Sequence, residues 1–171
     1  MIFLNIVLLE PEIPFNTGNI GRTCVATDSK LHLIKPLGFE IDDKSIKRSG
    51  LDYWQDLEVY YYENFADFVE KNNNPMIYIA STKAKNLYSD VCYEEDSFIM
   101  FGRESSGTPE EILIQYPETC IRIPMHEKHR SLNLSTSASI VLYEALRQQN
   151  FKGLLLEGEL RKYKWVDVSN D

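Results

Sequence analysis

Short apolar runs alternate along this chain with stretches in which apolar residues recur at helical spacing. The first run, Ile2–Leu9, is almost continuously apolar, which is typical of a strand buried on both faces of a parallel sheet. Five further strands are predicted, at Leu31–Ile34, Glu58–Tyr62, Met76–Ala80, Ser97–Phe101 and Cys120–Ile123. Because strands and helices alternate with mostly short loops, we expect an α/β fold with a largely parallel sheet and flanking helices.

Two helices are predicted in the first third of the chain. Glu10–Phe15 holds two prolines and is expected to be irregular, and Asn16–Asn19 is expected to form a turn. A short helix should follow at Ile20–Thr27. Asp42–Ser49 has an acidic first turn and a basic last turn and is followed by Gly50, which also indicates a helix.

Capping signals predict two helix starts further along. Asn64 precedes apolar residues at helical spacing and is expected to be an N-cap. Thr108 is expected to cap the next helix, with Pro109 at its first position and Glu111 closing a capping box.

The longest predicted helix, Ser135–Gln149, begins among small polar residues. Its apolar face is formed by Leu134, Ala138, Val141, Leu142 and Ala145. A polar loop and the segment Ser131–Ser135 lead into it, so its free N–H groups and positive dipole end suit a polar ligand. Alternatively, these Ser and Asn side chains only cap their own helix.

The composition indicates one globular domain, because 43% of the 171 residues are hydrophobic. We assign residues 1–153 to this domain and leave 154–171 as a tail without a readable role. The apolar start has no basic flank and ends within nine residues, so we expect neither a signal peptide nor a membrane segment. Three separated cysteines form no metal-like pair and suggest buried thiols in the cytoplasm.

The charge of the chain gives a mixed signal about nucleic acid. A net charge of −8 argues mildly against such a partner, but binding needs only a local basic patch. The sequence contains two clusters of basic residues that could form such a patch. The first comprises Lys44, Lys47 and Arg48, and the second comprises Lys128, His129 and Arg130. The lysines of the first cluster could also merely complement a helix end.

Three polar loops should meet at the carboxyl ends of the parallel strands, where ligands bind in such sheets. They are Glu10–Arg22, Gly102–Gly107 and Ile123–Ser135. The two glycines allow the backbone to approach a ligand closely or to adopt a positive φ. Neither a dinucleotide fingerprint nor a P-loop motif occurs. His126 and His129 lack an obvious third ligand, so we expect no metal.

These loops carry a specific family resemblance. The stretches NTGNIGR (Asn16–Arg22), FGRESSGTP (Phe101–Pro109) and IRIPM…RSLNLSTSASIVLYEA (Ile121–Ala145) resemble the three motifs of the SPOUT class of RNA 2′-O-ribose methyltransferases. The opening NIVLLEPEIPFNTGNIGR and the segment LIKPLGFEIDDKSIKRSGLDYW resemble its minimal tRNA (cytidine/uridine-2′-O)-methyltransferases, which modify the wobble nucleotide. The resemblance covers roughly Asn5–Gly153, and Arg103 and Thr136 depart from the usual motif residues.

The resemblance implies a C-terminal trefoil knot, S-adenosylmethionine as cofactor and a homodimer docked through the long helix. The cofactor-binding residues would be Ala80, Gly102, Ile123, Met125, Ser131, Leu132 and Leu134. The catalytic site would comprise Arg22, Glu104, Asn133 and Ser135, with Arg22 as a base or an orienter of the hydroxyl. Contacts to the anticodon stem-loop of tRNA would come from Lys44, Lys47, Arg48 and Arg130.

Three alternatives to this function remain open. One is a 2′-O-methyltransferase for ribosomal RNA, although such enzymes often carry an added RNA-binding domain. Another is a catalytically silent RNA-binding protein of the same fold, and the third is an unrelated nucleotide-binding α/β enzyme. For the homodimer, we expect Tyr143 and Leu146 to lie outside the core-facing stripe and the short helix after Arg22 to be their partner.

Overall fold

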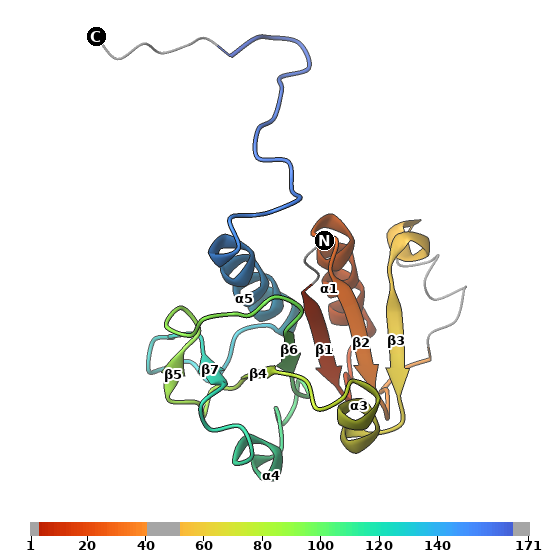
Figure 1. Ribbon diagram of the computed structural model, residues 1–171, viewed down its shortest axis with the longest axis vertical. Helices are drawn as coiled ribbons and strands as arrows, with labels where there is room; N and C mark the ends of the chain where they lie inside the picture. The colour runs from red at the N-terminus through yellow and green to blue at the C-terminus, as the bar shows by residue number, and fades with distance from the viewer. Residues whose placement is uncertain (1–3, 41–51, 166–171) are drawn as a thin grey trace.

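The structure, a computed structural model, describes residues 4–40 and 52–165. At its centre is a sheet of seven strands in the order β3-β2-β1-β6-β4-β7-β5 (Figure 1). The strands are β1 (Asn5–Leu9), β2 (Lys30–Ile34), β3 (Val59–Tyr62), β4 (Ile77–Ala80), β5 (Asn86–Leu87), β6 (Phe98–Phe101) and β7 (Cys120–Arg122). All neighbouring strands pair in parallel, which confirms the predicted fold class and the six predicted strands.

The sequence pattern missed β5, the edge strand Asn86–Leu87. Two residues are too short to show a period, so no local signal could have found the strand. Tertiary hydrogen bonds hold it in place: the amide of Tyr88 donates to the carbonyl of Arg122 at 3.0 Å, and the Asn86 side chain donates to the carbonyl of Cys120 at 3.1 Å.

Helices cover both faces of the sheet (Figure 1). On one face lie α1 (Pro14–Ala26) and α5 (Leu134–Gln148), with the 3-10 helix η1 (Asp52–Asp56) beside α1; on the other lie α3 (Phe65–Lys71) and α4 (Glu110–Leu113). The side chains of Ile6 and Leu8 point to the first face, and those of Val7 and Leu9 to the second. This division explains why β1 is apolar at each position from Ile6 to Leu9.

Helix α5 forms as the spacing predicted, within one residue of its expected end. Its stripe from Ala138 to Ala145 is buried against the sheet. Leu146 is also buried in this core, so the expectation that it lies outside the core-facing stripe is wrong. Tyr143, in contrast, is exposed.

Helix α1 begins earlier than predicted, because Asn16–Asn19 is helical and not a turn. Pro14 occupies the start of the helix, where its missing N–H would have no helical partner anyway. Asn16, Thr17 and Gly18 are buried. Burial of this face therefore outweighs the weak helix propensity of these residues, which is a tertiary effect that a local pattern does not report.

One of the two predicted caps is confirmed and the other is wrong. The side chain of Asn64 accepts a hydrogen bond of 2.9 Å from the amide of Asp67 and so caps α3. Helix α4 has Pro109 as its N-cap and no side-chain cap. Thr108 is instead buried in the turn that packs on Gly102, and its hydroxyl has no hydrogen-bond partner among the described residues.

Two expectations are not tested by the sheet and its helices. The helix predicted at Asp42–Ser49 lies outside the described residues. The trefoil knot stays a prediction. No helix in the described ranges is long and apolar enough to cross a membrane.

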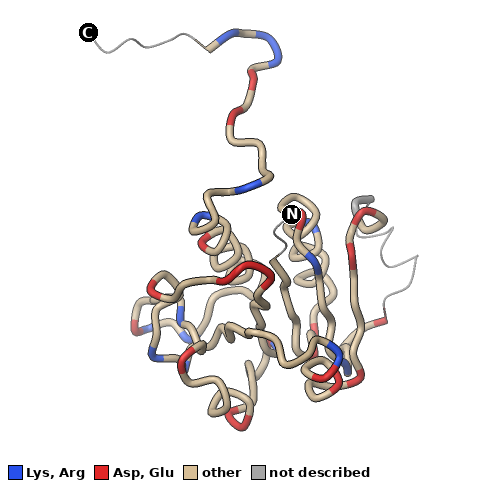
Figure 2. The backbone as a smooth tube through the Cα atoms, viewed as in Figure 1, with Lys and Arg blue, Asp and Glu red and all other residues tan. Residues whose placement is uncertain are grey.

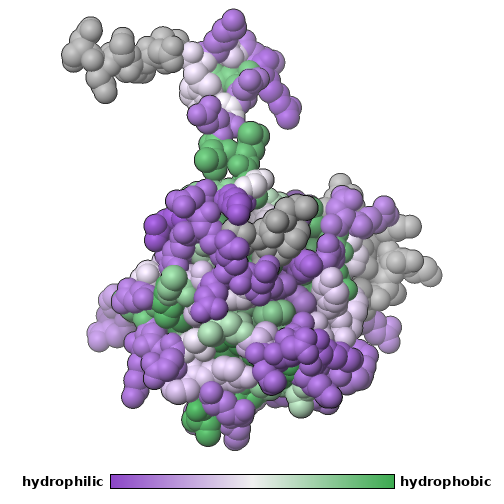
Figure 3. All heavy atoms as spheres, in the orientation of Figure 1, coloured by the Kyte–Doolittle hydropathy of each residue, from purple (hydrophilic) through white to green (hydrophobic). Residues whose placement is uncertain are grey.

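The chain continues past α5 as an extended tail that stands away from the body (Figures 1 and 3). Phe151 and Leu154 still pack against the core, but Leu155 is 91% exposed. From there to residue 165 every side chain is exposed.

A buried histidine links three segments of the sheet. His32, on β2, pairs through Nδ1 with the Tyr62 hydroxyl at 2.8 Å and through Nε2 with Oδ1 of Asn5 at 3.1 Å. Asn5 Oδ1 accepts and the Tyr62 hydroxyl then donates, so the ring fits as a neutral Nε2–H tautomer. Burial, with a smaller contribution from Lys30, lowers the pKa of His32 to about 3.

This lowered pKa predicts a pH-dependent loss of stability. The unfolded chain binds a proton on His32 near pH 6.5, whereas the folded protein resists it down to about pH 3. Neutral His32 therefore makes its full contribution to the free energy of unfolding above pH 6.5. This contribution falls by about 1.4 kcal/mol per pH unit as the pH decreases towards 3. Urea unfolding of wild type should therefore show a steeper pH dependence between pH 6.5 and 4.5 than unfolding of His32→Gln. The exposed His129→Gln variant is the control, and equal slopes in all three proteins would contradict the assignment.

Candidate active site

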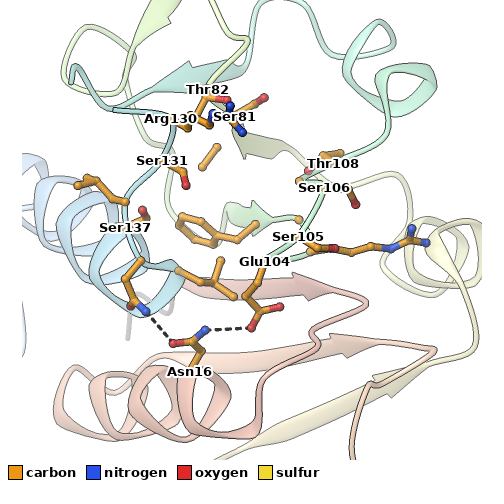
Figure 4. Close-up of a pocket in the computed structure, with 18 of the residues that line it drawn as sticks. Asn16, Ser81, Thr82, Glu104, Ser105, Ser106, Thr108, Arg130, Ser131 and Ser137 are labelled. Carbon is orange, nitrogen blue, oxygen red and sulfur yellow. Dashed lines mark hydrogen bonds between the residues drawn. The ribbon is translucent and has the colours of Figure 1, made fainter. Parts of the chain in front are cut away.

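A pocket of about 520 Å³ lies beyond the carboxyl ends of β4, β6 and β7, next to the N-terminus of α5 (Figure 4). Its walls come mainly from the three loops that the sequence predicted to meet there, together with residues 80–82 at the end of β4. The lining residues are Ile13, Asn16, Ala80, Ser81, Thr82, Phe101, Gly102, Arg103, Glu104, Ser105, Ser106, Gly107, Thr108, Ile123, Met125, Arg130, Ser131, Leu132, Asn133, Leu134 and Ser137.

Most of the predicted site residues line this one pocket. They include the seven predicted cofactor-binding residues, Ala80, Gly102, Ile123, Met125, Ser131, Leu132 and Leu134, and also Glu104, Asn133 and Arg130. Ser135 and Arg22 are not among the lining residues. The predicted RNA contacts Lys44, Lys47 and Arg48 lie outside the described part of the chain.

Sequence reasoning missed several polar residues of the pocket. Asn16 was interpreted as part of a turn, and Ser137 was given no role. Ser81 and Thr82 directly follow β4, so the argument from strand ends that found the other loops could have found them.

The carboxylate of Glu104 organises the entrance to α1. One oxygen accepts from the amide of Glu12 at 2.8 Å, and the other accepts from the amide of Ile13 at 3.2 Å and from the Asn16 side chain at 3.1 Å. The N-cap of α1, Ile13, has no side-chain acceptor of its own. Glu104 therefore supplies, from another loop, the negative group that a helix N-terminus favours.

Asn16 passes this constraint on to α5. Its side-chain oxygen accepts from Nδ2 of Asn133 at 3.0 Å (Figure 4). Asn133 is also the N-cap of α5: its oxygen accepts from the amide of Thr136 at 3.2 Å and from the hydroxyl of Ser135 at 2.7 Å. The two interpretations of this polar segment thus hold together, since Asn133 caps its own helix and joins the pocket network.

A second set of contacts fastens the same two loops. Arg103 forms an ion pair with Glu10, and both carboxylate oxygens of Glu12 accept hydrogen bonds of 2.8 Å from the amide and the hydroxyl of Ser105. These bonds, that from the amide first, hold the pKa of the Glu12 carboxyl below its usual value. Arg103, which departs from the usual family residue, therefore has a structural partner in this chain.

The two glycines of the motif loop serve the loop itself. A Cβ atom on Gly102 would lie 2.2 Å from the carbonyl carbon of Gly107 and 2.2 Å from the amide nitrogen of Thr108. Gly107 has a φ of +71°, in the left-handed region that favours glycine. The sequence predicted that these glycines allow either a positive φ or a close approach to a ligand. Gly107 has the positive φ, whereas the close approach at Gly102 is to the protein's own backbone.

Arg22 lies on the exposed side of α1. It follows Asn16 by six residues, or roughly 9 Å along the helix axis, and does not line the pocket within the described chain. His126 and His129 are exposed, with ring centroids 6.3 Å apart. Within residues 4–40 and 52–165, no group of three His, Cys, Asp or Glu side chains could hold a metal ion.

Two solved structures share this fold, a parallel α/β sheet with flanking helices. A solved structure from Bacillus anthracis superimposes with a TM-score of 0.86 at 48% identity, covering 90% of this chain and 99% of that one. A second structure, from work on 2′-OH methylation of C/U34 on tRNA, has a TM-score of 0.82 at 38% identity, over 87% and 97% of the two chains.

Sequence comparison identifies the family. The profile described as the SpoU rRNA Methylase family matches residues 3–143, and the chain belongs to this family. A tRNA (cytidine(34)-2′-O)-methyltransferase from Escherichia coli strain K12 is 46% identical over 154 residues, covering 90% of this chain and 98% of that protein. A Listeria monocytogenes protein provisionally given the same name is 51% identical over 156 residues, covering 90% and 92%.

The contact at Gly102 predicts a large effect for a small substitution. In Gly102→Ala the new methyl group must displace the Gly107–Thr108 backbone, so the free energy of unfolding should fall by about 2–3 kcal/mol. Gly158→Ala is the matched control, because nothing lies within 4 Å of its added Cβ atom. Urea unfolding of both variants measures the difference. Equal stability would mean that the loop can shift to admit the methyl group.

Proposed function

We propose that this protein transfers a methyl group from S-adenosylmethionine to the ribose 2′-hydroxyl of the wobble nucleotide, cytidine or uridine, of tRNA. The observation that carries the proposal is the match to the E. coli tRNA (cytidine(34)-2′-O)-methyltransferase, which covers nearly all of that protein. The position of the pocket supports it, since the matched region contains every residue that lines the pocket.

The pocket suits an adenosyl group joined to a polar amino-acid tail. Ile123, Leu132 and Leu134 offer apolar surface for a flat ring, and Ser81 and Thr82 (Figure 4) offer polar groups. The volume of about 520 Å³ lies within the range of small-molecule sites. We assign the cofactor role to Ala80, Gly102, Ile123, Met125, Ser131, Leu132 and Leu134.

S-adenosylmethionine supplies a methyl group that is already activated by its sulfonium. The protein then has to orient the ribose hydroxyl in line with that group and help its proton leave. Glu104 fits a positioning role better than that of a base, because both of its oxygens already accept hydrogen bonds. Asn133 and Ser135 likewise hold the start of α5.

Arg22 is the residue that we propose acts on the hydroxyl. A guanidinium stays protonated at neutral pH, so it serves as an orienter of the hydroxyl and the neighbouring phosphate and not as a base. Arg130, exposed at the rim of the pocket, is proposed to contact the RNA backbone together with Lys44, Lys47 and Arg48.

We further propose that the protein is a homodimer in which Arg22 serves the pocket of the partner subunit. Two observations support this homodimer. Arg22 is exposed, and the surface beside it is apolar, where Phe15 is 71% exposed. Tyr143 adds exposed apolar surface on α5. A reaction on tRNA also accords with a cytoplasmic protein. All three cysteines are free thiols, but Cys92 is exposed, so the prediction that all three are buried is wrong for that residue.

Methyl transfer to defined RNA tests the proposed activity. The protein should transfer the methyl group of labelled S-adenosylmethionine to bulk tRNA, and mass spectrometry of the digested RNA should place it at nucleotide 34. A tRNA already 2′-O-methylated at that nucleotide is the control acceptor and should gain nothing. Label in ribosomal RNA alone would contradict the tRNA assignment, and binding of both ligands without transfer would indicate a silent RNA-binding protein.

The shared site predicts complementation between two inactive proteins. Arg22→Ala should bind cofactor and tRNA but transfer little, since only the orientation of the hydroxyl is lost. Leu132→Asp should lose cofactor binding, because it places a carboxylate in the apolar wall of the pocket. Calorimetry checks each binding property before mixing.

In the mixture, a heterodimer contains one pocket that binds cofactor and faces an intact Arg22. Partial recovery of methyl transfer is therefore expected. Absence of recovery, with subunit exchange shown by tagged copies, would place Arg22 and the cofactor within one chain.

A further inference from the structure

The end of the described tail forms a small closed loop. The indole N–H of Trp165 donates to the carbonyl of Gly158 at 3.1 Å, which brings residues seven positions apart into contact. Between these two ends lie Glu159, Leu160, Arg161, Lys162, Tyr163 and Lys164. We call residues 158–165 the tail loop.

The tail loop concentrates positive charge in a protein of net charge −8. Three of the four residues Arg161–Lys164 are cationic, and Figure 2 shows basic residues gathered at the far end of the described tail. In the part of the chain that the structure describes, none of their charged groups forms an ion pair with a carboxylate. Other exposed lysines, such as Lys35 and Lys71, do have acidic partners.

Two aromatic rings stand among these cations. Tyr163 is 78% exposed and Trp165 is 71% exposed. Exposed rings interleaved with Lys and Arg are the combination that binds single-stranded nucleic acid, through base stacking and phosphate contacts. An acidic protein partner would contact mainly the cations and an apolar partner mainly the rings, whereas an RNA contacts both.

The tail loop is separate from the pocket. The pocket lies at the N-terminus of α5, and the tail leaves from the other end of this 15-residue helix, roughly 22 Å away. The tail also lies beyond residue 143, where the family match ends. A tRNA extends far beyond the nucleotide being modified, so a second contact at this distance can increase affinity without touching the reaction.

We propose that the tail loop is a second RNA-binding element of this protein. Arg161, Lys162 and Lys164 contact phosphates, and Tyr163 and Trp165 stack on an unpaired base. The inference rests on the proposed function in that tRNA is the RNA concerned, but it concerns binding and not methyl transfer.

The test compares two variants that each lose two lysines. Lys162→Ala with Lys164→Ala should weaken tRNA binding and lower the slope of log affinity against log salt by about 1.4–1.8, for two lost phosphate contacts. Lys35→Ala with Lys71→Ala removes the same charge from ion-paired positions and should leave the slope near that of wild type. Calorimetry with S-adenosylmethionine checks that both variants are folded.

A third variant tests the rings. Tyr163→Ala with Trp165→Ala should weaken tRNA binding by about tenfold at constant salt slope, because stacking is lost and charge is kept. In steady-state transfer assays, both tail variants should raise the KM for tRNA and leave kcat unchanged.

Each other result has a definite meaning. Wild-type affinity and salt slope in both tail variants would overturn the proposal. A tail variant that sediments at lower mass than wild type and loses RNA binding only for that reason would show that the tail contacts a second copy of the chain, which also overturns it. If wild type binds tRNA but transfers no methyl group, the proposed function fails while the tail variants still decide the RNA contact.

Discussion

The carboxylate of Glu104 joins segments that lie 88 to 92 positions apart in the chain. It takes three hydrogen bonds from the start of α1, a helix whose own N-cap residue provides no acceptor. Asn16 is thereby held where it can accept from Asn133, and Asn133 in turn caps α5. The Glu104 carboxylate thus fixes the N-termini of α1 and α5 relative to β6. The pocket has its shape because these ends cannot move independently.

Much of this arrangement follows from the order of residues. A strand buried on both faces is largely apolar, so β1 and β2 were evident from their apolar runs, although Asn5 and His32 are buried polar residues within them. The stripe of α5 was equally legible, since its spacing is local. Parallel strands then bring their carboxyl ends to one edge, which is why three distant loops could be predicted to line one pocket.

The features that escaped the sequence depend on contacts between distant segments. Helix α1 starts at Pro14 because Asn16 and Thr17 in its first turn are buried and Glu104 caps its N-terminus, and nothing near Pro14 encodes that partner. Thr108 has the form of a cap, but the requirement that its backbone pack on Gly102 draws it inward. The helix there begins later as a result. Thr108 is thus a residue type that commonly caps helices, but tertiary packing outweighs this local preference.

The geometry of α1 also bears on how a complete active site could form. Residues of an α-helix are rotated by about 100° each, so Arg22 points roughly 120° away from Asn16, whereas it lies within about 20° of Phe15. Asn16 is tied to the pocket of its own chain by Glu104 and Asn133. At this angle Arg22 points away from that pocket, and a rotation of α1 that brought it there would break the hydrogen bonds of Asn16. If Arg22 takes part in the reaction, a pocket of a second copy, approached through the exposed face that bears Phe15, is the arrangement that leaves the network intact.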